Sequence, residues 1–250
     1  MWSGRCSITA IGRKVTFMKT AILLGTLTML VLPRPLLGAI GCTLSNPAED
    51  LKYLFPEMTS YKEDLKEFPR MKDGNELFKS LKERLASDLD PIYETFETPY
   101  TVYAIFKGEK KIGIVHGVNV PGKGGVIQVF LSTDVLTGAI HRLFFQRIES
   151  PAADRLKAKE FRSQFDSMTL ADFYKHDYYS VSKTKHPSDK VARIIPPPLD
   201  ENGKPDYEAT LRGIRKNLIL LDLFVYDRKY EPFFEKAKEV LSKKSAKEKT

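Results

Sequence analysis

The chain has 250 residues, of which 42% are hydrophobic, so it can build the core of one large domain or two small ones. Its formal charge of +8 lies at the two ends: residues 1–42 carry five cations and no acid, and residues 236–250 carry six lysines and two glutamates. Residues 43–235 therefore have a net charge of −1, which excludes the basic surface that nucleic-acid binding requires.

The N-terminal segment has the layout of an export signal. From Met18 the sequence reads MKTAILLGTLTMLVLPRPLLGAIGC, with one lysine, an uncharged and mostly apolar run from Ala21 to Leu32, and small residues before Cys42. The apolar run is too short for a permanent transmembrane helix. Residues 1–41 are therefore predicted to be a bacterial secretory signal peptide that starts at Met18.

Cys42 follows Ala39-Ile40-Gly41, a pattern similar to a lipoprotein cleavage box, in which the thiol receives a diacylglycerol before the signal is removed. The alternative is an ordinary cleaved signal with an incidental Cys42. The cysteine count favours the lipoprotein, because the mature chain would keep this cysteine alone and an exported free thiol needs a role. The same count excludes cysteine-bound haem, iron–sulfur clusters and structural zinc.

The next elements lead into a folded domain. Residues 42–75 are predicted to be a lipid-attached tether and lead-in, because a short helical start is followed by proline and glycine breaks. An amphipathic helix is expected over 76–89, where leucine and phenylalanine recur at helical spacing between charged residues.

The hydrophobic period changes at Tyr100. Four β-rich runs between residues 99 and 148 are joined by short turns, which predicts a four-stranded antiparallel sheet. Helices are expected over 153–165 and 208–226, with a polar, turn-rich loop over 175–206 between them. The fold class is therefore α+β, with the sheet packed against the helices.

The last two elements differ in polarity. The helix over 208–226 is apolar nearly all round and is expected to be buried on several sides. Residues 232–250 are predicted to be a basic C-terminal tail that forms a frayed, solvated helix.

Three stretches, in this order, resemble the FMN-binding domain of the periplasmic subunits of Rnf-type and sodium-pumping quinone reductases and of related lipoproteins. They are GKGGVIQVFLSTDVLTGAIHRLFFQRIESP, a following helix that ends in FRSQF, and EATLRGI, which opens the last apolar helix. The resemblance covers residues 98–225 and implies that residues 76–231 form an FMN-binding-like domain.

The resemblance also implies a cofactor site. Gly124-Gly125 matches the Gly-Gly turn of the family, Glu149-Ser150-Pro151 matches its Glu-Thr-Pro, and Ala209-Thr210 matches the end of its Ser-Gly-Ala-Thr motif. In the family the final threonine carries FMN through a phosphoester that a flavin transferase makes, which implies covalent FMN on Thr210. A phosphate at a helix start would meet free backbone N–H groups and the positive end of the helix dipole.

Two functions are consistent with these patterns. The resemblance implies an exported, membrane-anchored electron carrier on the periplasmic side of the bacterial cell envelope, which would exchange electrons with a membrane redox complex or quinone-linked reductase. The alternative is a lipoprotein that keeps the fold without flavin and serves as an interaction module. Tyr207-Glu208 favours this alternative, because it replaces Ser-Gly and puts a carboxylate beside the expected phosphate. Thr210 is explained equally well as a helix-start residue favoured by capping.

Other ionisable side chains give weaker patterns. They are His116, His141, His176, His186, Asp166, Asp172 and Asp177. The histidines lack metal-ligand spacing, and the two at 116 and 141 are expected on strands. The aspartates could form an acid–base cluster with His176, although a solvated loop explains them better. The aromatic and basic stretch YKHDYYSVSKTKH could dock a partner, although a covered loop is the simpler interpretation.

Overall fold

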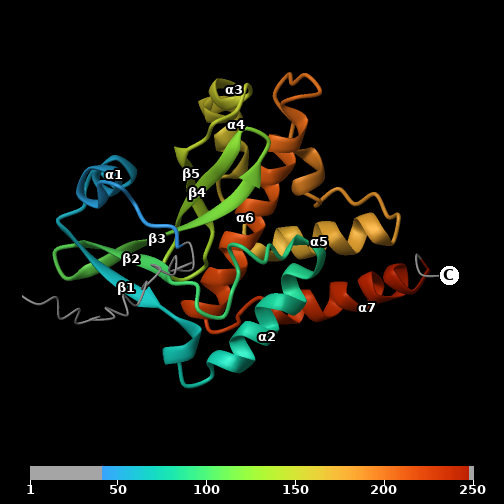
Figure 1. The fold of residues 1–250 in the computed structure, drawn as a ribbon, viewed down its shortest axis with the longest axis horizontal. Helices are drawn as coiled ribbons and strands as arrows, with labels where there is room; N and C mark the ends of the chain where they lie inside the picture. Colours follow the sequence, from blue (N-terminus) through green and yellow to red (C-terminus); the bar gives the residue numbers. More distant parts are fainter. Residues whose placement is uncertain (1–40, 248–250) are drawn as a thin grey trace, which may run out of the picture. The chain divides into compact units, whose positions relative to one another are not determined.

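This computed structural model describes residues 41–247. They belong to the second of the two units into which the chain divides, Gly38–Thr250. The predicted signal peptide, including Met18, lies outside the described residues except for Gly41. A five-stranded antiparallel sheet with the order β1-β2-β3-β4-β5 forms the centre of the fold (Figure 1). Its strands are β1 (Ser60–Lys66), β2 (Tyr100–Lys107), β3 (Lys110–Gly122), β4 (Gly125–Thr133) and β5 (Ile140–Arg147).

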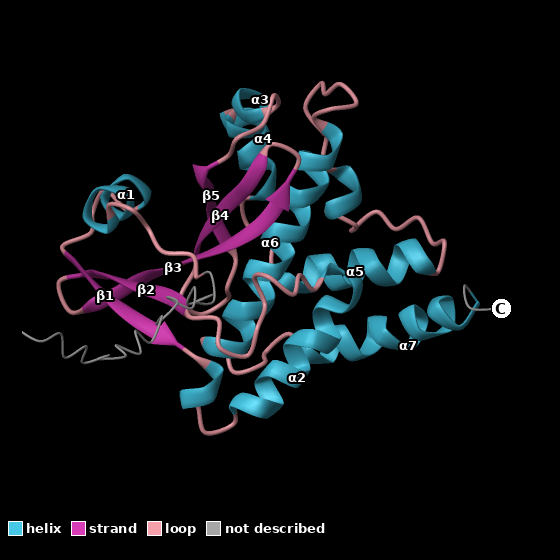
Figure 2. Cartoon of the chain, in the orientation of Figure 1, coloured by secondary structure: helices cyan, strands magenta, loops and turns pink. Residues whose placement is uncertain are grey.

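The helices surround this sheet (Figure 2). The α-helices are α1 (Pro47–Leu54), α2 (Gly74–Leu85), α3 (Ala153–Lys157), α4 (Lys159–Arg162), α5 (Leu170–Val181), α6 (Lys204–Phe224) and α7 (Glu231–Lys247). Single 3-10 turns are η1 (Phe68–Arg70), η2 (Ala86–Asp88), η3 (Ser163–Phe165) and η4 (Val191–Arg193). The predicted α+β class, with an antiparallel sheet packed against helices, is confirmed.

The four strands predicted between residues 99 and 148 are present, and β1 adds a fifth. β1 pairs with β2 along its whole length, from Ser60 opposite Phe106 to Lys66 opposite Tyr100. Its sequence SYKEDLK is mostly charged, and every one of its residues is at least partly exposed. Charged side chains are typical of edge strands, where they discourage pairing with another chain. The β-rich pattern that located the other strands is therefore missing from β1.

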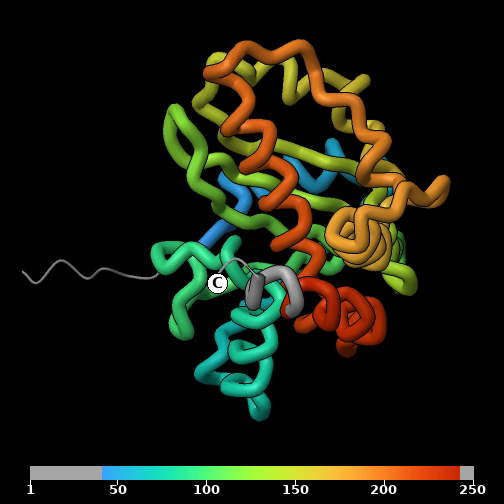
Figure 3. The backbone as a smooth tube through the Cα atoms, turned by 90° about the vertical axis from the view of Figure 1, so that its right-hand side faces the viewer, coloured from blue at the N-terminus to red at the C-terminus, as the bar shows by residue number. Residues whose placement is uncertain are grey.

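Helix α6 packs across one face of the sheet, on β3 and β4 (Figure 3). Its residues Ala209, Ile214 and Leu218 are buried in one cluster with sheet residues such as Val120 and Val129. Gly213 lets the helix approach closely, because a Cβ atom there would lie 2.9 Å from Cγ2 of Val129. This burial agrees with the prediction that the helix is covered on several sides.

The opposite face of the sheet is covered by the segment predicted to be a tether. Leu51 and Leu54 of α1 pack with Cys42 against the sheet residues Val115 and Phe130. Cys42 also forms an isolated parallel bridge with Tyr100 of β2. The prediction of a lead-in outside the domain is therefore wrong for this segment, which supplies both a covering helix and an edge strand.

Two other predicted boundaries were wrong. The helix expected over 153–165 is divided: Ala158, with a ψ of 138°, separates α3 from α4, and α4 is followed directly by η3. The loop expected over 175–206 is helical at its start, because α5 extends to Val181. α5 begins with a capping box in which Thr169 and Asp172 each bind the backbone N–H of the other.

The basic C-terminal segment is part of the fold. Helices α5 and α7 lie side by side (Figures 1 and 3), and Phe234 and Ala237 of α7 are buried in the main cluster. A buried ion pair links the helices below the sheet: Nη1 of Arg84 in α2 lies 2.6 Å from Oδ2 of Asp222 in α6. Asp222 also accepts a hydrogen bond from the backbone N–H of Tyr230, just before α7. The predicted helix is confirmed, but its solvated character is wrong.

Candidate functional site

The three segments of the predicted flavin site lie together at one end of the sheet. The turn between β3 and β4 contacts the loop after β5 so closely that a Cβ atom on Gly124 would overlap the carbonyl oxygen of Glu149. Gly125 has a φ of +139°, which favours glycine. The same turn contacts α6, since a Cβ atom on Gly122 would lie 2.8 Å from Oδ1 of Asp206. The order of the motifs thus locates segments that meet in space.

A carboxylate of the chain itself occupies the point where these segments meet. The side chain of Asp206 is fully buried, and its Oδ1 accepts a hydrogen bond of 2.6 Å from the backbone N–H of Lys123 in the turn. The second carboxylate oxygen, Oδ2, has no hydrogen-bond partner among the described residues. Glu149 adds a further carboxylate beside the turn, paired with Arg147 at 2.6 Å. The turn therefore presents its N–H group to a protein anion.

Thr210 lies inside α6 and not at its start. The helix begins at Lys204, with Pro205 in its first turn, so Thr210 belongs to the second turn. Its side chain is fully buried, and Oγ1 donates a hydrogen bond of 2.8 Å to the carbonyl oxygen of Asp206. Only the first four N–H groups of an α-helix lack partners within the helix, and Thr210 lies beyond them. The expectation of a helix-start residue, either as a cap or as an attachment point, is wrong.

The other residues of the predicted flavin site are packed in the fold, bonded locally or directed to solvent. Ala209 is fully buried against the sheet, and Tyr207 is half-buried, with its ring centroid 5.9 Å from that of Phe161. Ser150 is used locally, since its Oγ accepts a hydrogen bond of 3.0 Å from the N–H of Ala152, and Pro151 is exposed. Glu208, expected to face the phosphate, is exposed. The residues present do not fit FMN attached to Thr210.

Cys42 is a core residue in this structure. Its side chain is only 4% exposed, and burial raises the pKa of its thiol to about 12, although Lys216 acts in the opposite direction. The backbone beside it is also held, because the carbonyl oxygen of Gly41 accepts a hydrogen bond of 3.1 Å from Nδ2 of Asn119. A lipid on this sulfur would require the segment to leave the sheet.

A buried polar network joins α6 to β3. Nζ of Lys216 pairs with Oε1 of Glu94 and donates a hydrogen bond of 2.5 Å to the carbonyl oxygen of Asn119. At the next residue of α6, Oδ1 of Asn217 lies 3.0 Å from Nδ1 of His116. The amide nitrogen of Asn217 also donates a hydrogen bond of 2.8 Å to the carbonyl oxygen of His116. These bonds are buried between α6 and the sheet, so they hold α6 in position, although Nε2 of His116 has no hydrogen-bond partner among the described residues.

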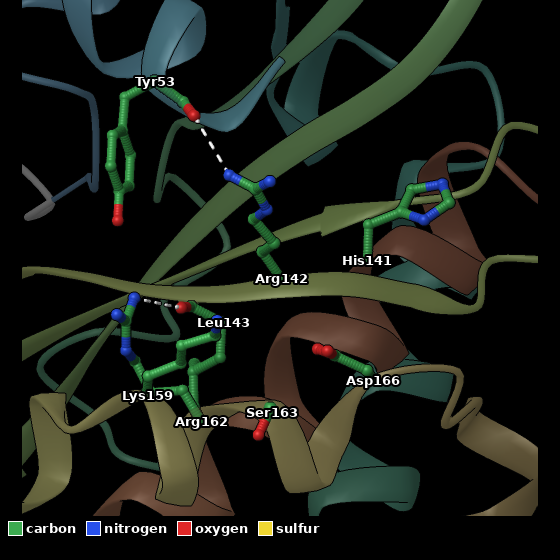
Figure 4. A pocket seen from close by; sticks show the side chains of 8 residues that line it. All are labelled: Tyr53, His141, Arg142, Leu143, Lys159, Arg162, Ser163 and Asp166. Carbon is green, nitrogen blue, oxygen red and sulfur yellow. Dashed lines mark hydrogen bonds between the residues drawn. The ribbon is translucent and has the colours of Figure 1, made fainter. Parts of the chain in front are cut away.

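A basic cleft lies elsewhere, between α1, β5 and the segment that contains α4 and η3 (Figure 4). It has a volume of about 420 Å³, and its ionisable lining residues are His141, Arg142, Lys159, Arg162 and Asp166. Tyr53 and Ser163 line it as well. Three cations and one carboxylate therefore line the cleft.

Hydrogen bonds to backbone carbonyl groups hold both arginines of the basic cleft. Arg142 extends from β5 toward α1 and donates to the carbonyl oxygen of Tyr53 at 3.2 Å (Figure 4). Arg162 extends from α4 toward β5 and donates to the carbonyl oxygen of Leu143 at 3.1 Å (Figure 4). Partial burial raises the pKa of Asp166, although Arg142, His141 and Arg162 act in the opposite direction. The arrangement can bind an anion.

No family model, curated protein or solved structure matches this chain. The function must therefore be inferred from the chemistry of the sites.

The remaining ionisable candidates do not form an acid–base cluster. His176 pairs with Asp189 at 3.0 Å, and Asp177 pairs with Arg215 at 2.7 Å. Oγ of Ser180 lies 3.4 Å from both ring nitrogens of His176, so its hydroxyl group lies beside the ring edge and not in line with one nitrogen. This geometry does not activate a serine nucleophile. Of the other two aspartates, one caps α5 and one lines the basic cleft.

Two further searches concern the described part of the chain only. Within residues 41–247, no group of three or more His, Cys, Asp or Glu side chains could hold a metal ion. No helix in that range is both long enough and apolar enough to cross a membrane.

Sequence reasoning missed the basic cleft. His141 was expected on a strand, with Arg142 as its neighbour, and Lys159 and Arg162 lie one helical turn apart. Nothing in the sequence indicates that these two pairs face each other, because the break at Ala158 sets the direction of α4.

Proposed function

We propose that the protein is a flavin-free binding module with a fold of the FMN-binding-domain type. The observation that carries this proposal is the buried carboxylate of Asp206, which accepts a hydrogen bond from the N–H group of Lys123 where the β3–β4 turn meets the first turn of α6. A phosphate there would meet a carboxylate in place of a donor, and like charges at this distance repel. Electron transfer in the family that the sequence resembles depends on the flavin, so a chain that does not hold flavin is better explained by an interaction role.

We also propose that the protein is exported and that its signal is an ordinary cleaved one. The signal-like layout from Met18 supports export. The burial of Cys42 supports an incidental cysteine, since a thiol in a tightly packed apolar cluster behaves as a small hydrophobic side chain. In this interpretation neither a lipid anchor nor a flavin transferase is a partner of the mature protein.

Flavin loading tests the first proposal. The full chain is co-expressed with a flavin transferase, and the purified protein is examined by visible absorbance and by fluorescence on a denaturing gel. We expect a colourless protein. A yellow wild-type protein with one bound flavin per chain would overturn the proposal and restore the electron carrier.

A matched variant separates the fold from the cofactor. Tyr207→Ser with Glu208→Gly recreates the Ser-Gly step of the family, and the two small residues weaken the first turns of α6. If this variant gains fluorescent flavin and the further change Thr210→Val removes it, the fold is of the FMN-binding type and the natural sequence has lost the site. If the variant folds but stays colourless, the assignment of this fold type is wrong.

A further inference from the structure

The basic cleft concentrates positive charge in a part of the chain that is otherwise slightly acidic. Residues 43–235 have a net charge of −1 within a total of +8, yet the cleft is lined by three cations, Arg142, Lys159 and Arg162, and a single carboxylate, Asp166. With His141 neutral, the lining of the cleft has two more cations than anions. Such a concave surface of one sign attracts a ligand of the opposite charge.

Arg142 and Arg162 are held in place by hydrogen bonds and still have free N–H donors. A guanidinium group has five N–H donors in a planar fork, and each arginine uses one for a backbone carbonyl oxygen, at Tyr53 and at Leu143. These two bonds tie the side chains to α1 and β5, so that little entropy is lost when the remaining donors bind a ligand. Planar guanidinium groups match the paired oxygens of phosphate and carboxylate groups.

The size of the cleft and the groups along it narrow the ligand class. About 420 Å³ lies within the range of small-molecule sites and exceeds what a bare phosphate ion fills. Ser163 adds a hydroxyl group on the same side as Lys159 and Arg162. Tyr53, which lines the cleft, is 55% exposed, and its ring can offer a flat face to an aromatic or apolar group.

We propose that this cleft binds a soluble organic phosphomonoester, with its phosphate held by Arg142, Lys159 and Arg162. A phosphomonoester carries close to two negative charges at neutral pH, which matches the excess of cations in the cleft. Its organic group lies toward Tyr53. This site goes beyond the proposed flavin-free module and does not depend on it, since none of its residues belongs to the β3–β4 turn, the Glu149 loop or α6.

Titration calorimetry of the full chain with three probes tests the site. Adenosine monophosphate supplies a phosphomonoester with an aromatic group, adenosine removes the phosphate, and inorganic phosphate removes the organic group. We expect saturable binding of adenosine monophosphate with a dissociation constant below about 1 mM, weaker binding of inorganic phosphate, and none of adenosine. Binding should weaken as salt is added, because partly exposed charges are screened.

Variants on the two sides of the cleft identify the residues. Lys159→Gln changes an exposed side chain and should weaken adenosine monophosphate about ten-fold with no change in thermal stability. Arg142→Gln should have a similar effect on binding. The matched control is Arg147→Gln, which removes an exposed arginine from the same strand outside the cleft and should leave binding unchanged.

Four results would overturn the proposal. The first is no saturable binding of adenosine monophosphate up to about 10 mM, and the second is equal binding of adenosine. The third is inorganic phosphate binding as tightly as adenosine monophosphate, which would exclude the organic group. The fourth is a loss in Arg147→Gln equal to that in Lys159→Gln, which would indicate general attraction of anions.

Discussion

His116 should make the fold sensitive to acid. It is fully buried on β3, where Nδ1 lies 3.0 Å from Oδ1 of Asn217. The amide nitrogen of Asn217 donates to the carbonyl oxygens of His116 and Val129, so its Oδ1 must accept and Nδ1 of the histidine carries the proton. Nε2 has no hydrogen-bond partner among the described residues. A second proton there would lack an acceptor.

Burial lowers the pKa of His116 from 6.5 to about 4. The hydrogen bond to Asn217 acts in the opposite direction, whereas the positive charge of Lys216 acts in the same direction. The ring of Tyr100 lies 6.1 Å from the imidazole and adds no charge that would stabilise the protonated form. The folded state therefore holds this histidine neutral.

The sign and size of the effect follow from the two pKa values. Above pH 6.5 the histidine is neutral in both states, and this contribution to stability is fully present. As the pH falls from 6.5 toward 4, the unfolded chain binds a proton that the folded chain does not, and stability is lost. At about 1.4 kcal/mol per pKa unit, the loss reaches about 2.5 kcal/mol at about pH 4.5.

Urea unfolding of the wild-type protein and of His116→Gln, at about pH 7.5 and about pH 4.5, measures how much of the loss of stability in acid comes from His116. Glutamine can still donate to Asn217 and does not titrate in this range. The wild-type protein should lose about 2.5 kcal/mol more than the variant between the two pH values. The control His186→Gln replaces an exposed histidine and should follow the wild type. Equal losses in wild type and His116→Gln would refute the reasoning.

Three other predictions concern packing. Asp222→Ala removes the close partner of the buried Arg84, which keeps only a 3.5 Å contact with Glu231, and should reduce the free energy of unfolding by about 3–5 kcal/mol. The double change Arg84→Met with Asp222→Leu should recover most of this loss, and urea unfolding measures both variants. Gly213→Ala places a methyl group against Val129 and should reduce the free energy of unfolding by about 1–3 kcal/mol, measured by urea unfolding. An unchanged urea midpoint would mean that α6 can shift away from the sheet. Cys42 should react with a thiol-reactive dye only after the protein unfolds, and the intact mass of the exported protein should include no lipid. Rapid labelling of the thiol in the native protein, or the added mass of a diacylglycerol, would contradict the burial of Cys42.

Local patterns predicted the elements whose signals are local. The strands from Tyr100 onward were located because β-rich runs alternate with short turns, and the turns fall where the structure has them. β1 was not predicted, because an edge strand that is exposed on both faces needs no alternation of apolar and polar residues. The start of α6 was placed too late, because the apolar spacing begins at Leu211 while the first turns are polar. Pro205, a residue typical of the first helical turn, was the signal for the earlier start.

The earlier start of α6, at Lys204, determines which residues lie at the predicted flavin site. The Gly124 turn and the Glu149 loop meet because chain order in a meander fixes which loops share an end of the sheet, and the first turn of α6 contacts the same β3–β4 turn through Asp206. The order of the motifs did not indicate which atoms meet. Because α6 begins at Lys204, the residue that contacts the β3–β4 turn is Asp206. Thr210 lies one helical turn further along α6, where its hydroxyl group donates a hydrogen bond to the carbonyl oxygen of Asp206. A motif aligned residue by residue can therefore be in the right place along the chain and still lack its chemistry, since the free backbone N–H groups of an α-helix exist only in its first turn.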